Sequence, residues 1–266
     1  MSLPIFVIDA FTAEPFAGNP AAVCFLDTVR DDAWMHSVAA EMNLSETAFL
    51  LPVAPDGTWS LRWFTPSIEV DLCGHATLAS AHALWETGQL SPHARARFAT
   101  RSGELFAVQA GDLIELDFPA TVVEPAEAPA GLLDGLGIGD ALGVYRNQFD
   151  YLVEVADAAT VTGLDPLHAD LRALPARGVI VTAPDDRDDV DFVSRFFAPG
   201  SGVDEDPVTG SAHCALGPFW GARFGRTELT GYQASRRGGF VRVRVEGDRV
   251  VLVGHAVTVV RGELLA

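Results

Sequence analysis

The chain reads Cys73-Gly-His-Ala-Thr-Leu-Ala79 in its first half and Thr209-Gly-Ser-Ala-His-Cys-Ala215 in its second half. Each stretch follows a Phe-x-Pro sequence, at Phe64 and at Phe197, and an acidic segment. Both patterns are typical of a strand, a loop, a glycine and then a helix of small residues. Coincidence is the alternative for motifs this short. Because the order of elements matches as well as the residues, we interpret the chain as an internal repeat of two related halves.

Strand-like runs surround the two motifs. Short apolar or alternating segments bounded by Gly, Pro, Asn and Asp predict strands, and spacings of four residues predict helices. The predicted strands are residues 4–11, 21–26, 59–63, 94–100, 104–109, 113–118, 151–155, 178–183, 192–197, 240–245 and 250–253. The predicted helices are residues 31–42 and 74–87, and a further helix follows Gly210. The chain is therefore predicted to be strand-rich, with one longer helix in each half.

Residues 120–139 are rich in Pro, Ala and Gly and are interpreted as a linker. A chain of 266 residues is long enough for two domains of roughly 130 residues. We expect an N-terminal domain over residues 1–118, completed by residues 255–266, and a C-terminal domain over residues 119–254.

The charge balance excludes several classes of protein. The chain has 36 acidic and 18 basic residues, a formal net charge of -18, and every basic residue is arginine. Without lysine there is no Schiff-base chemistry, hence no pyridoxal-phosphate enzyme or lysine aldolase, and no ordinary P-loop nucleotidase. The acidic excess argues against nucleic-acid and anionic-membrane partners. It still allows a small anionic metabolite, because backbone dipoles can bind one.

The termini and the cysteines indicate the compartment. The N-terminal segment lacks a basic region and reaches Asp9 early, so it is not predicted to be a secretory signal. The longest apolar stretch, residues 250–260, is too short to span a membrane. Three widely spaced cysteines without a Cys-x-x-Cys motif suggest free thiols in a reducing compartment. We therefore expect a cytoplasmic protein.

The two glycine–helix junctions are candidate anion sites. A helix N-terminus presents unpaired N–H groups and a partial positive charge, and glycine lets an anion approach the backbone closely. Gly74 and Gly210 therefore predict two sites able to hold a carboxylate or to stabilise an enolate. For a single junction, the simpler interpretation is a turn before a core helix. Two junctions with titratable residues beside both favour function.

Three side chains near these junctions, and Glu46 in a separate segment, are candidates for acid/base chemistry or hydrogen bonding. His75 lies in a first helical turn, where its charged form is disfavoured, so we expect a neutral proton carrier or hydrogen-bond donor. Asp206 ends an acidic run near Gly210, and Ser211 is the counterpart of His75. Glu46 heads an apolar run, and burying a carboxylate favours general acid/base function. Taken one at a time, a capping histidine, a solvated acidic run and an edge-strand glutamate are the alternatives.

Metal and thiol chemistry are less well supported. Cys73/His75 and His213/Cys214 lack zinc-ligand spacing, although the four side chains could converge in space. Cys73 could be a nucleophile, because helix N-termini lower thiol pKa values. A racemase with two cysteines is disfavoured, since Thr209 stands where the repeat would place the second thiol. No Gly-x-Gly-x-x-Gly sequence opens a helix after a strand, so a dinucleotide site is unsupported.

These motifs together resemble the PhzF-like (phenazine biosynthesis isomerase) family of the diaminopimelate-epimerase-like superfamily. The matching segments span nearly the whole chain in the family's order, and as a set they are highly specific. They are Asp9-Ala-Phe-Thr12, Phe16-Ala-Gly-Asn-Pro20, Asn43-Leu-Ser-Glu-Thr47, Arg62-Trp-Phe-Thr-Pro66, Asp71-Leu-Cys-Gly-His-Ala-Thr77, Asp204-Glu-Asp-Pro-Val-Thr-Gly-Ser-Ala-His213 and Gly231-Tyr-Gln-Ala-Ser-Arg-Arg-Gly-Gly239.

The resemblance implies an α/β (α+β type) fold of two pseudo-symmetric domains, each a mixed, curved sheet around a central helix. It implies an active site in the interdomain cleft, a homodimer, and no cofactor or metal. The residue that matches the family's catalytic glutamate is Glu46, and His75, Asp206 and Ser211 match neighbouring active-site positions. The positions that match substrate-binding residues are Ser45, Gly74 and Gly210.

Our main hypothesis is a cofactor-independent isomerase that shifts a proton on a small carboxylate. Glu46, His75 and Asp206 are the expected catalytic residues, and Ser45, Gly74, Gly210 and Ser211 are the expected substrate-binding residues. One alternative is a thiol-dependent racemase or epimerase that uses Cys73. The other is a non-catalytic metabolite-binding or scaffold protein with the same fold. Phenazine synthesis is only one of the pathways that the resemblance allows.

Overall fold

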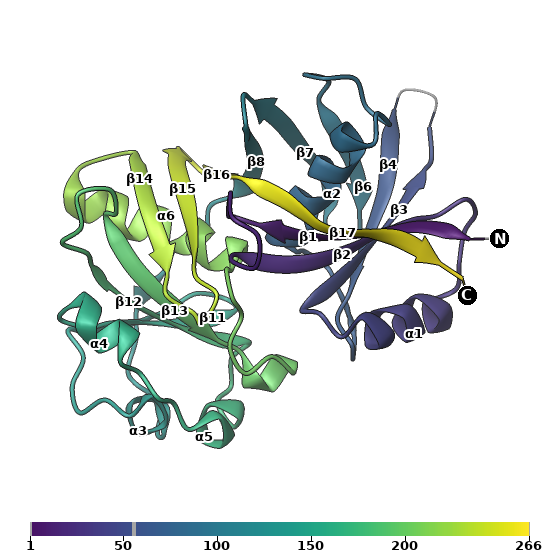
Figure 1. Ribbon diagram of the computed structural model, residues 1–266. Coiled ribbons are helices and arrows are strands. Elements are labelled where there is room, and N and C mark those ends of the chain that lie inside the picture. Colours follow the sequence, from purple (N-terminus) through teal and green to yellow (C-terminus); the bar gives the residue numbers. More distant parts are fainter. Residues whose placement is uncertain (1, 55–56, 266) are drawn as a thin grey trace. The chain divides into compact units, whose positions relative to one another are not determined.

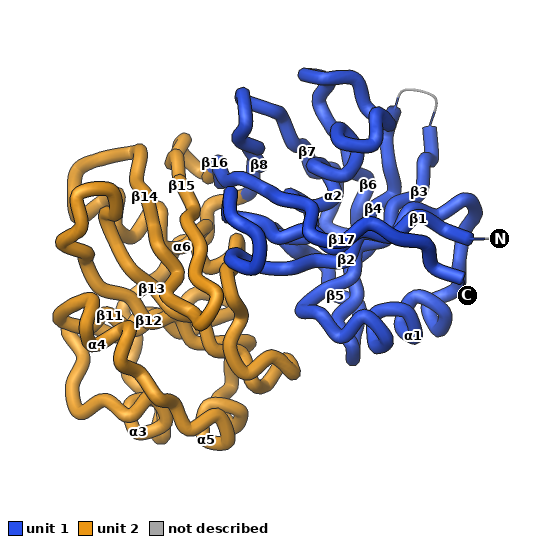
Figure 2. Tube along the Cα trace, in the orientation of Figure 1, with its two compact units in different colours: residues 1–118, 251–266 blue, residues 119–250 orange. Residues whose placement is uncertain are grey.

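The computed structural model describes residues 2–54 and 57–265 of the chain. The chain folds as two compact units (Figure 2). Unit 1 comprises Met1–Phe118 and Val251–Ala266, and unit 2 comprises Pro119–Val250. None of the helices in the described ranges combines the length and the apolar character needed to cross a membrane.

In its described residues, unit 1 is a mixed sheet with the helices α1 and α2. Its sheet order is β17–β1–β2–β3–β4–β6–β7–β8, and the short β5 pairs with β4. The pairs β2–β3 and β4–β6 are parallel, and the other pairs are antiparallel. The elements are β1 (Leu3–Ala10), β2 (Asn19–Phe25), α1 (Asp32–Met42), β3 (Glu46–Pro52), β4 (Thr58–Phe64), β5 (Glu69–Val70), α2 (Gly74–Glu86), β6 (Ala96–Thr100), β7 (Gly103–Ala110), β8 (Leu113–Pro119) and β17 (Ala256–Leu264).

Unit 2 has its own mixed sheet, in the order β9–β10–β11–β12–β13–β14–β15. The parallel pairs are β11–β12 and β13–β14. The elements are β9 (Glu124–Pro125), α3 (Leu132–Leu136), β10 (Gly143–Arg146), β11 (Asp150–Glu154), α4 (Ala158–Thr162), α5 (His168–Arg172), β12 (Gly178–Pro184), β13 (Phe192–Phe197), the 3-10 turn η1 (Pro199–Ser201), α6 (Gly210–Phe224), β14 (Glu228–Gln233) and β15 (Gly239–Glu246). Strand β16 (Arg249–Gly254) carries the chain from unit 2 into unit 1.

The two units repeat one topology. From β1 to β7 the successive pairings are antiparallel, parallel, antiparallel, parallel and antiparallel. From β10 to β15 the sequence of pairings is the same. Along the chain, α2 lies between the parallel strands β4 and β6, and α6 lies between the parallel strands β13 and β14. The two helices therefore occupy matching positions in the two units. The predicted fold class of two pseudo-symmetric mixed α/β halves is confirmed.

A buried helix forms the centre of each unit (Figure 1). Ten of the 13 residues of α2 and ten of the 15 residues of α6 are buried, so neither helix has an extended solvent-facing side. Small residues allow this burial, because they let strands approach the helix backbone closely. At Gly217 of α6, an added Cβ atom would lie 2.6 Å from the Cγ1 atom of Val243 on β15. The predicted helices beginning at Gly74 and Gly210 are confirmed.

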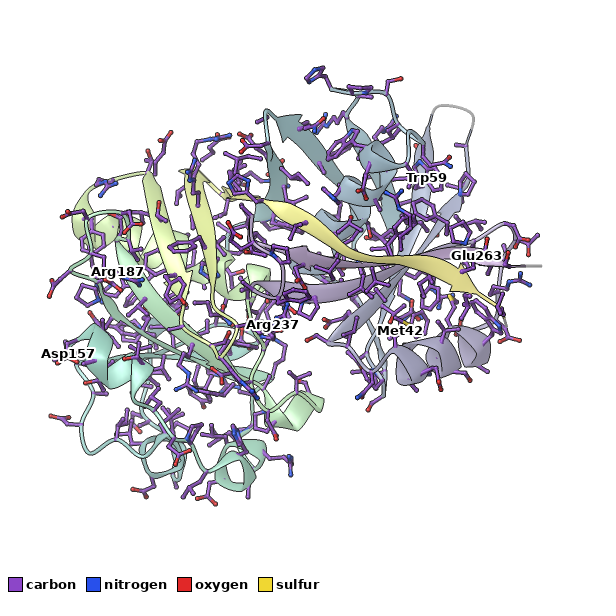
Figure 3. All side chains as sticks on the ribbon, viewed as in Figure 1. Met42, Trp59, Asp157, Arg187, Arg237 and Glu263 are labelled. Carbon is purple, nitrogen blue, oxygen red and sulfur yellow. The ribbon has the colours of Figure 1, made fainter. Side chains whose placement is uncertain are left out.

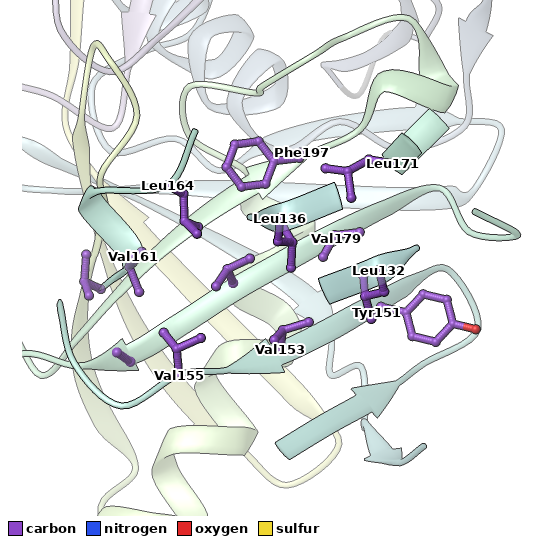
Figure 4. Close-up of a cluster of buried hydrophobic side chains, with 13 residues drawn as sticks. Leu132, Leu136, Tyr151, Val153, Val155, Val161, Leu164, Leu171, Val179 and Phe197 are labelled. Atoms are coloured by element: carbon purple, nitrogen blue, oxygen red, sulfur yellow. The ribbon is translucent and has the colours of Figure 1, made fainter. Parts of the chain in front are cut away.

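The segment predicted to be a linker belongs to unit 2, and that prediction is wrong. Residues 120–139 contain β9 and α3. Leu132 and Leu136 of α3 are completely buried in an apolar cluster with Val153, Val181 and Phe197 (Figure 4). The composition, rich in Pro, Gly and Ala, led to the linker prediction. The segment also contains two leucines four residues apart, and this spacing lets both side chains face the core from one helical turn.

Helix α1 was predicted within one residue of its observed start. The Asp31 carboxylate caps it by accepting a hydrogen bond of 2.8 Å from the backbone N–H of Trp34. Met35 and Val38 are buried in an apolar cluster of unit 1, and Met42 packs against that cluster at the end of the helix (Figure 3). The predicted four-residue spacing therefore marks the face of α1 that contacts the sheet.

Candidate active site

Three side chains predicted to carry chemistry meet in unit 1. Glu46 opens β3, Cys73 is the N-cap residue of α2, and His75 is the second residue of that helix. The Nε2 atom of His75 lies 3.2 Å from the Oε2 atom of Glu46, and the Sγ atom of Cys73 lies 3.6 Å from Nδ1 of His75. The Glu46 side chain is 16% exposed, whereas the His75 side chain is 3% exposed. The cluster is therefore open to solvent mainly at the carboxylate.

Asn19 completes this cluster, and the sequence reasoning gave it no role beyond a turn. It is fully buried at the start of β2, and its Nδ2 atom lies 3.0 Å from Nδ1 of His75. An amide nitrogen can only donate, so the contact places an acceptor at Nδ1 and directs the Nε2–H group toward Glu46. The sequence feature that could have identified Asn19 is that it is a single polar residue directly before the apolar run at residues 20–26.

The loop before Asn19 is held in a conformation that places this amide. The buried Asp9 carboxylate accepts a hydrogen bond of 2.7 Å from the backbone N–H of Phe16. Gly18 has φ +62°, and an added Cβ atom there would clash with the carbonyl oxygen of Ala10. The His75 ring thus contacts Asn19, whose position is fixed by the segments Asp9-Ala-Phe-Thr12 and Phe16-Ala-Gly-Asn-Pro20.

The electrostatics of His75 bear on the sequence expectation of a neutral ring. Burial lowers the pKa of the imidazole, but the Glu46 charge and the hydrogen bonds to Cys73 and Glu46 raise this pKa above its ordinary value of 6.5. Burial and the Glu46 charge raise the pKa of the Cys73 thiol to about 11. The thiol is therefore neutral near pH 7, and the Glu46 carboxylate is the anion beside the ring that favours its protonation. The neutral form of His75 stays a prediction: the acceptor at Nδ1 fits it, whereas the Glu46 carboxylate from β3 opposes it by raising the pKa of the ring.

We expect Glu46→Gln to lower the pKa of His75, because the stabilising carboxylate is lost while burial still opposes the charge. The same raised pKa means that the pair stabilises the fold fully below pH 6.5, and that this stabilisation is lost as pH rises through the folded-state pKa. Titration of the histidine ring resonances by NMR measures the change, with His75→Gln to assign the signal.

His213 is the internal control for this titration. Burial in unit 2 lowers its pKa to about 4, and its Nδ1 atom lies 2.8 Å from the carbonyl oxygen of Thr209. Its signal should not shift in Glu46→Gln. An unchanged pKa of His75 in that variant would contradict the assignment of Glu46 as the stabilising anion.

The three thiols are predicted to be unreactive in the folded protein. All three are buried, and burial raises the pKa values of Cys24 and Cys214 to about 12. Only the thiolate is the nucleophile in alkylation. At pH 7 we expect iodoacetamide to modify none of the cysteines in the native protein and all three in urea, as read from the intact mass. Selective native labelling of Cys73 would contradict this and would support a thiol mechanism.

The second junction is a hydrogen-bonded cluster in unit 2. Thr209 is the N-cap residue of α6, and its hydroxyl donates to Oδ2 of Asp206 at 2.5 Å. The fully buried Gln233 side chain accepts from the backbone N–H of Thr209 at 2.8 Å and donates to the Asp206 carbonyl oxygen at 2.7 Å. Asp206 is thereby fixed in place beside the first turn of α6. Sequence reasoning missed Gln233, which lies inside the matching segment 231–239.

The other predicted residues occupy corresponding places in the two units. Gly74 and Gly210 are buried and open α2 and α6, while Ser211 is half-buried at the helix position that His75 occupies in α2. Ser45 is half-buried and directly precedes β3. The structure thus places Glu46 and His75 together in unit 1 and fixes Asp206 in unit 2. The roles of these residues in substrate binding stay predictions.

Known proteins resemble this chain over its whole length. The sequence profile of the phenazine biosynthesis-like proteins matches residues 8–262. An uncharacterized isomerase from Halalkalibacterium halodurans is 54% identical and covers 100% of this chain and 99% of the relative. A crystal structure of a phenazine biosynthesis protein of the PhzF family from Enterococcus faecalis covers 100% of both chains at 41% identity, with a TM-score of 0.93. A hydroxyproline epimerase from Agrobacterium vitis, 14% identical, covers 99% of this chain and 91% of its own with a TM-score of 0.66 and shares the fold alone.

Proposed function

Because this chain belongs to the family of phenazine biosynthesis-like proteins, we propose that it is an isomerase that shifts a proton on a small carboxylate without a cofactor. Relatives over the full length are named isomerases, which supports this general class of enzyme. The observation that carries the finer proposal is the contact of 3.2 Å between Glu46 and the His75 ring, beside the N-terminus of α2.

The proposed reaction begins with Glu46 as the base. Its carboxylate removes a proton from a carbon next to an electron-withdrawing group, and the electron pair of the C–H bond passes into an enolate. The backbone N–H groups at Gly74 stabilise the negative charge. Glu46 then returns the proton to a different carbon, so substrate and product are isomers. His75 stabilises the carboxylate form of Glu46 before the first transfer and after the second.

Unit 2 contributes the second part of this proposal. We assign Asp206 to proton traffic, and Gly210 and Ser211 to the anionic group of the substrate, together with Ser45. The hydrogen bonds from Thr209 and Gln233 support this assignment because they hold Asp206 at the start of α6. A homodimer and a cytoplasmic location belong to the proposal as well.

Deuterium uptake from heavy water tests the proposal. Small amino, hydroxy and unsaturated carboxylates are incubated with the protein, and deuterium on carbon is followed by NMR and mass spectrometry. We expect one class to gain deuterium at carbon and to isomerise. A folded protein that binds a carboxylate but exchanges no proton on any member would identify a non-catalytic binding protein instead.

One observation favours the thiol alternative, namely the contact of 3.6 Å between Cys73 and His75. The raised pKa of Cys73, about 11, opposes it, since a thiol racemase needs a thiolate. The variant Cys73→Ser separates the two mechanisms. Proton exchange at or near the parent rate supports Glu46 as the acid/base, and complete loss of exchange in a folded variant supports the thiol.

A further inference from the structure

The cluster of Glu46, Cys73 and His75 has a second chemical property. Among the described residues it is the group of three potential metal ligands whose donor atoms all lie within 4.8 Å of one another. A carboxylate oxygen, an imidazole nitrogen and a sulfur are the three donor types that Zn²⁺ accepts in proteins. The sulfur favours ions such as Zn²⁺ and Cd²⁺ over Mg²⁺ and Ca²⁺, which prefer oxygen ligands.

The distances are close to those of a tetrahedral site. Zinc lies about 2.3 Å from sulfur and about 2.0 to 2.1 Å from nitrogen or oxygen, which places tetrahedral nitrogen and oxygen ligands roughly 3.3 Å apart and nitrogen and sulfur ligands roughly 3.6 Å apart. Here the Nε2 atom of His75 is 3.2 Å from the carboxylate of Glu46 and 4.0 Å from the sulfur of Cys73. All three donor atoms lie within 4.8 Å of one another, so an ion between them requires the Cys73 sulfur to move closer to the other two ligands.

Charge and burial also suit a divalent cation. A thiolate and a carboxylate together carry two negative charges, so an ion bound between them leaves the site neutral, which lowers the cost of burial. A coordinated thiol is deprotonated by the metal itself. Binding therefore releases the Cys73 proton and the proton shared by His75 and Glu46 to solvent. Glu46 is the most exposed of the three side chains, so an ion from solvent would reach the site at its carboxylate.

A partner outside the three ligands keeps the His75 ring in place. Asn19 contacts Nδ1, which leaves Nε2 directed at Glu46. In metal-bound histidine the common support runs in the other direction, since the non-ligating ring nitrogen carries the proton and donates it to an oxygen. The Asn19 amide can meet this requirement. A rotation of the amide by about 180° would place Oδ1 at the Nδ1–H group, because the two ends of an amide have the same shape.

We propose that Glu46, Cys73 and His75 form a binding site for a thiophilic divalent ion, Zn²⁺ or Cd²⁺, which inhibits the enzyme. The bound ion would occupy the carboxylate oxygen that accepts the proton in the reaction, so binding and proton transfer exclude each other. The inhibition rests on the proposed function, whereas the binding does not. As an inhibitor the ion is not required for activity, and removal of metal by a chelator should leave proton exchange unchanged.

Titration of the metal-free protein with Cd²⁺ tests the binding directly. Bonding of thiolate to Cd²⁺ produces an ultraviolet charge-transfer band, and native mass spectrometry counts the ions. We expect a band that saturates at one ion per chain and is absent in Cys73→Ser. In His75→Gln and Glu46→Gln the affinity should fall at least about tenfold, the smallest loss typical of even an outer partner of a metal ligand. Circular dichroism establishes that each variant is folded.

Two matched variants complete the design. Cys214→Ala removes another buried thiol, and His82→Gln removes the histidine of a second His–Glu pair on α2, whose atoms are 3.9 Å apart. Both should bind Cd²⁺ like the parent. A saturating band that persists in Cys73→Ser, or no saturable band in the parent, would overturn the site. Proton exchange, measured with a chelator present, reports on the proposed function separately, so either idea can fail while the other stands.

Discussion

Glu46→Gln is expected to reduce proton exchange by a factor of about 100 to 10,000, the range typical for loss of a general acid/base. Glutamine keeps the size of the side chain and a hydrogen-bond acceptor for Nε2 of His75, 3.2 Å away, but it cannot take up a proton from carbon. The loss should fall on the rate of exchange and leave binding of the carboxylate largely intact. Initial rates of deuterium uptake under saturating substrate measure it.

Glu86→Gln is the matched control. Glu86 is the last residue of α2 and forms the other His–Glu pair of that helix, with His82 at 3.9 Å, but it lies at the opposite end from Gly74. We expect its exchange rate to equal that of the parent. If Glu46→Gln exchanges as fast as the parent protein, another group is the acid/base and the proposed mechanism is wrong.

The two helix junctions were predictable because their signals are local. Glycine before a run of small residues marks the start of a buried helix, and both α2 and α6 begin at the predicted glycines. The apolar run after Glu46 likewise predicts a strand, and β3 begins at that residue. Local patterns therefore locate the residues that carry chemistry, and the repeat relates one unit to the other.

Partners supplied by distant segments could not be predicted in this way. Asn19 reaches His75 across 56 positions, and Gln233 reaches Thr209 across 24 positions. The group that raises the pKa of His75 also comes from another element, since Glu46 opens β3 whereas the helix N-terminus is local. Short elements such as α3 were missed because fewer than two helical turns leave too little periodicity to detect.

A buried ion pair in unit 2 leads to the largest predicted effect on stability. Asp150, on β11, is 1% exposed, and its two carboxylate oxygens accept hydrogen bonds from Nε and Nη2 of Arg177, which directly precedes β12. We expect Arg177→Met to lower the free energy of unfolding by about 3 kcal/mol at pH 7, because it leaves a buried charge without its partner. This is the lower end of the usual range, since the Arg177 side chain is 35% exposed and water already screens the pair.

The dependence on pH distinguishes a buried charge from lost packing. Burial raises the pKa of Asp150 above its ordinary value of 3.8, and the hydrogen bonds and charge of Arg177 oppose this rise. Without Arg177 the folded-state pKa rises further, so the penalty is complete above that pKa and disappears below 3.8, where the carboxyl group is neutral in both states. The destabilisation in urea should therefore shrink as pH falls from 7 toward 4.

The double variant Arg177→Met/Asp150→Asn provides the control for this pair, because asparagine keeps the shape of Asp150 but carries no charge. It should recover part of the stability that Arg177→Met loses, and its difference from the parent should depend little on pH. A double variant no more stable than Arg177→Met, together with a loss that is constant between pH 7 and 4, would mean that Arg177 acts through packing on Phe149 and Phe196, which its guanidinium contacts. The charge of Asp150 would then have no part in the stability of unit 2.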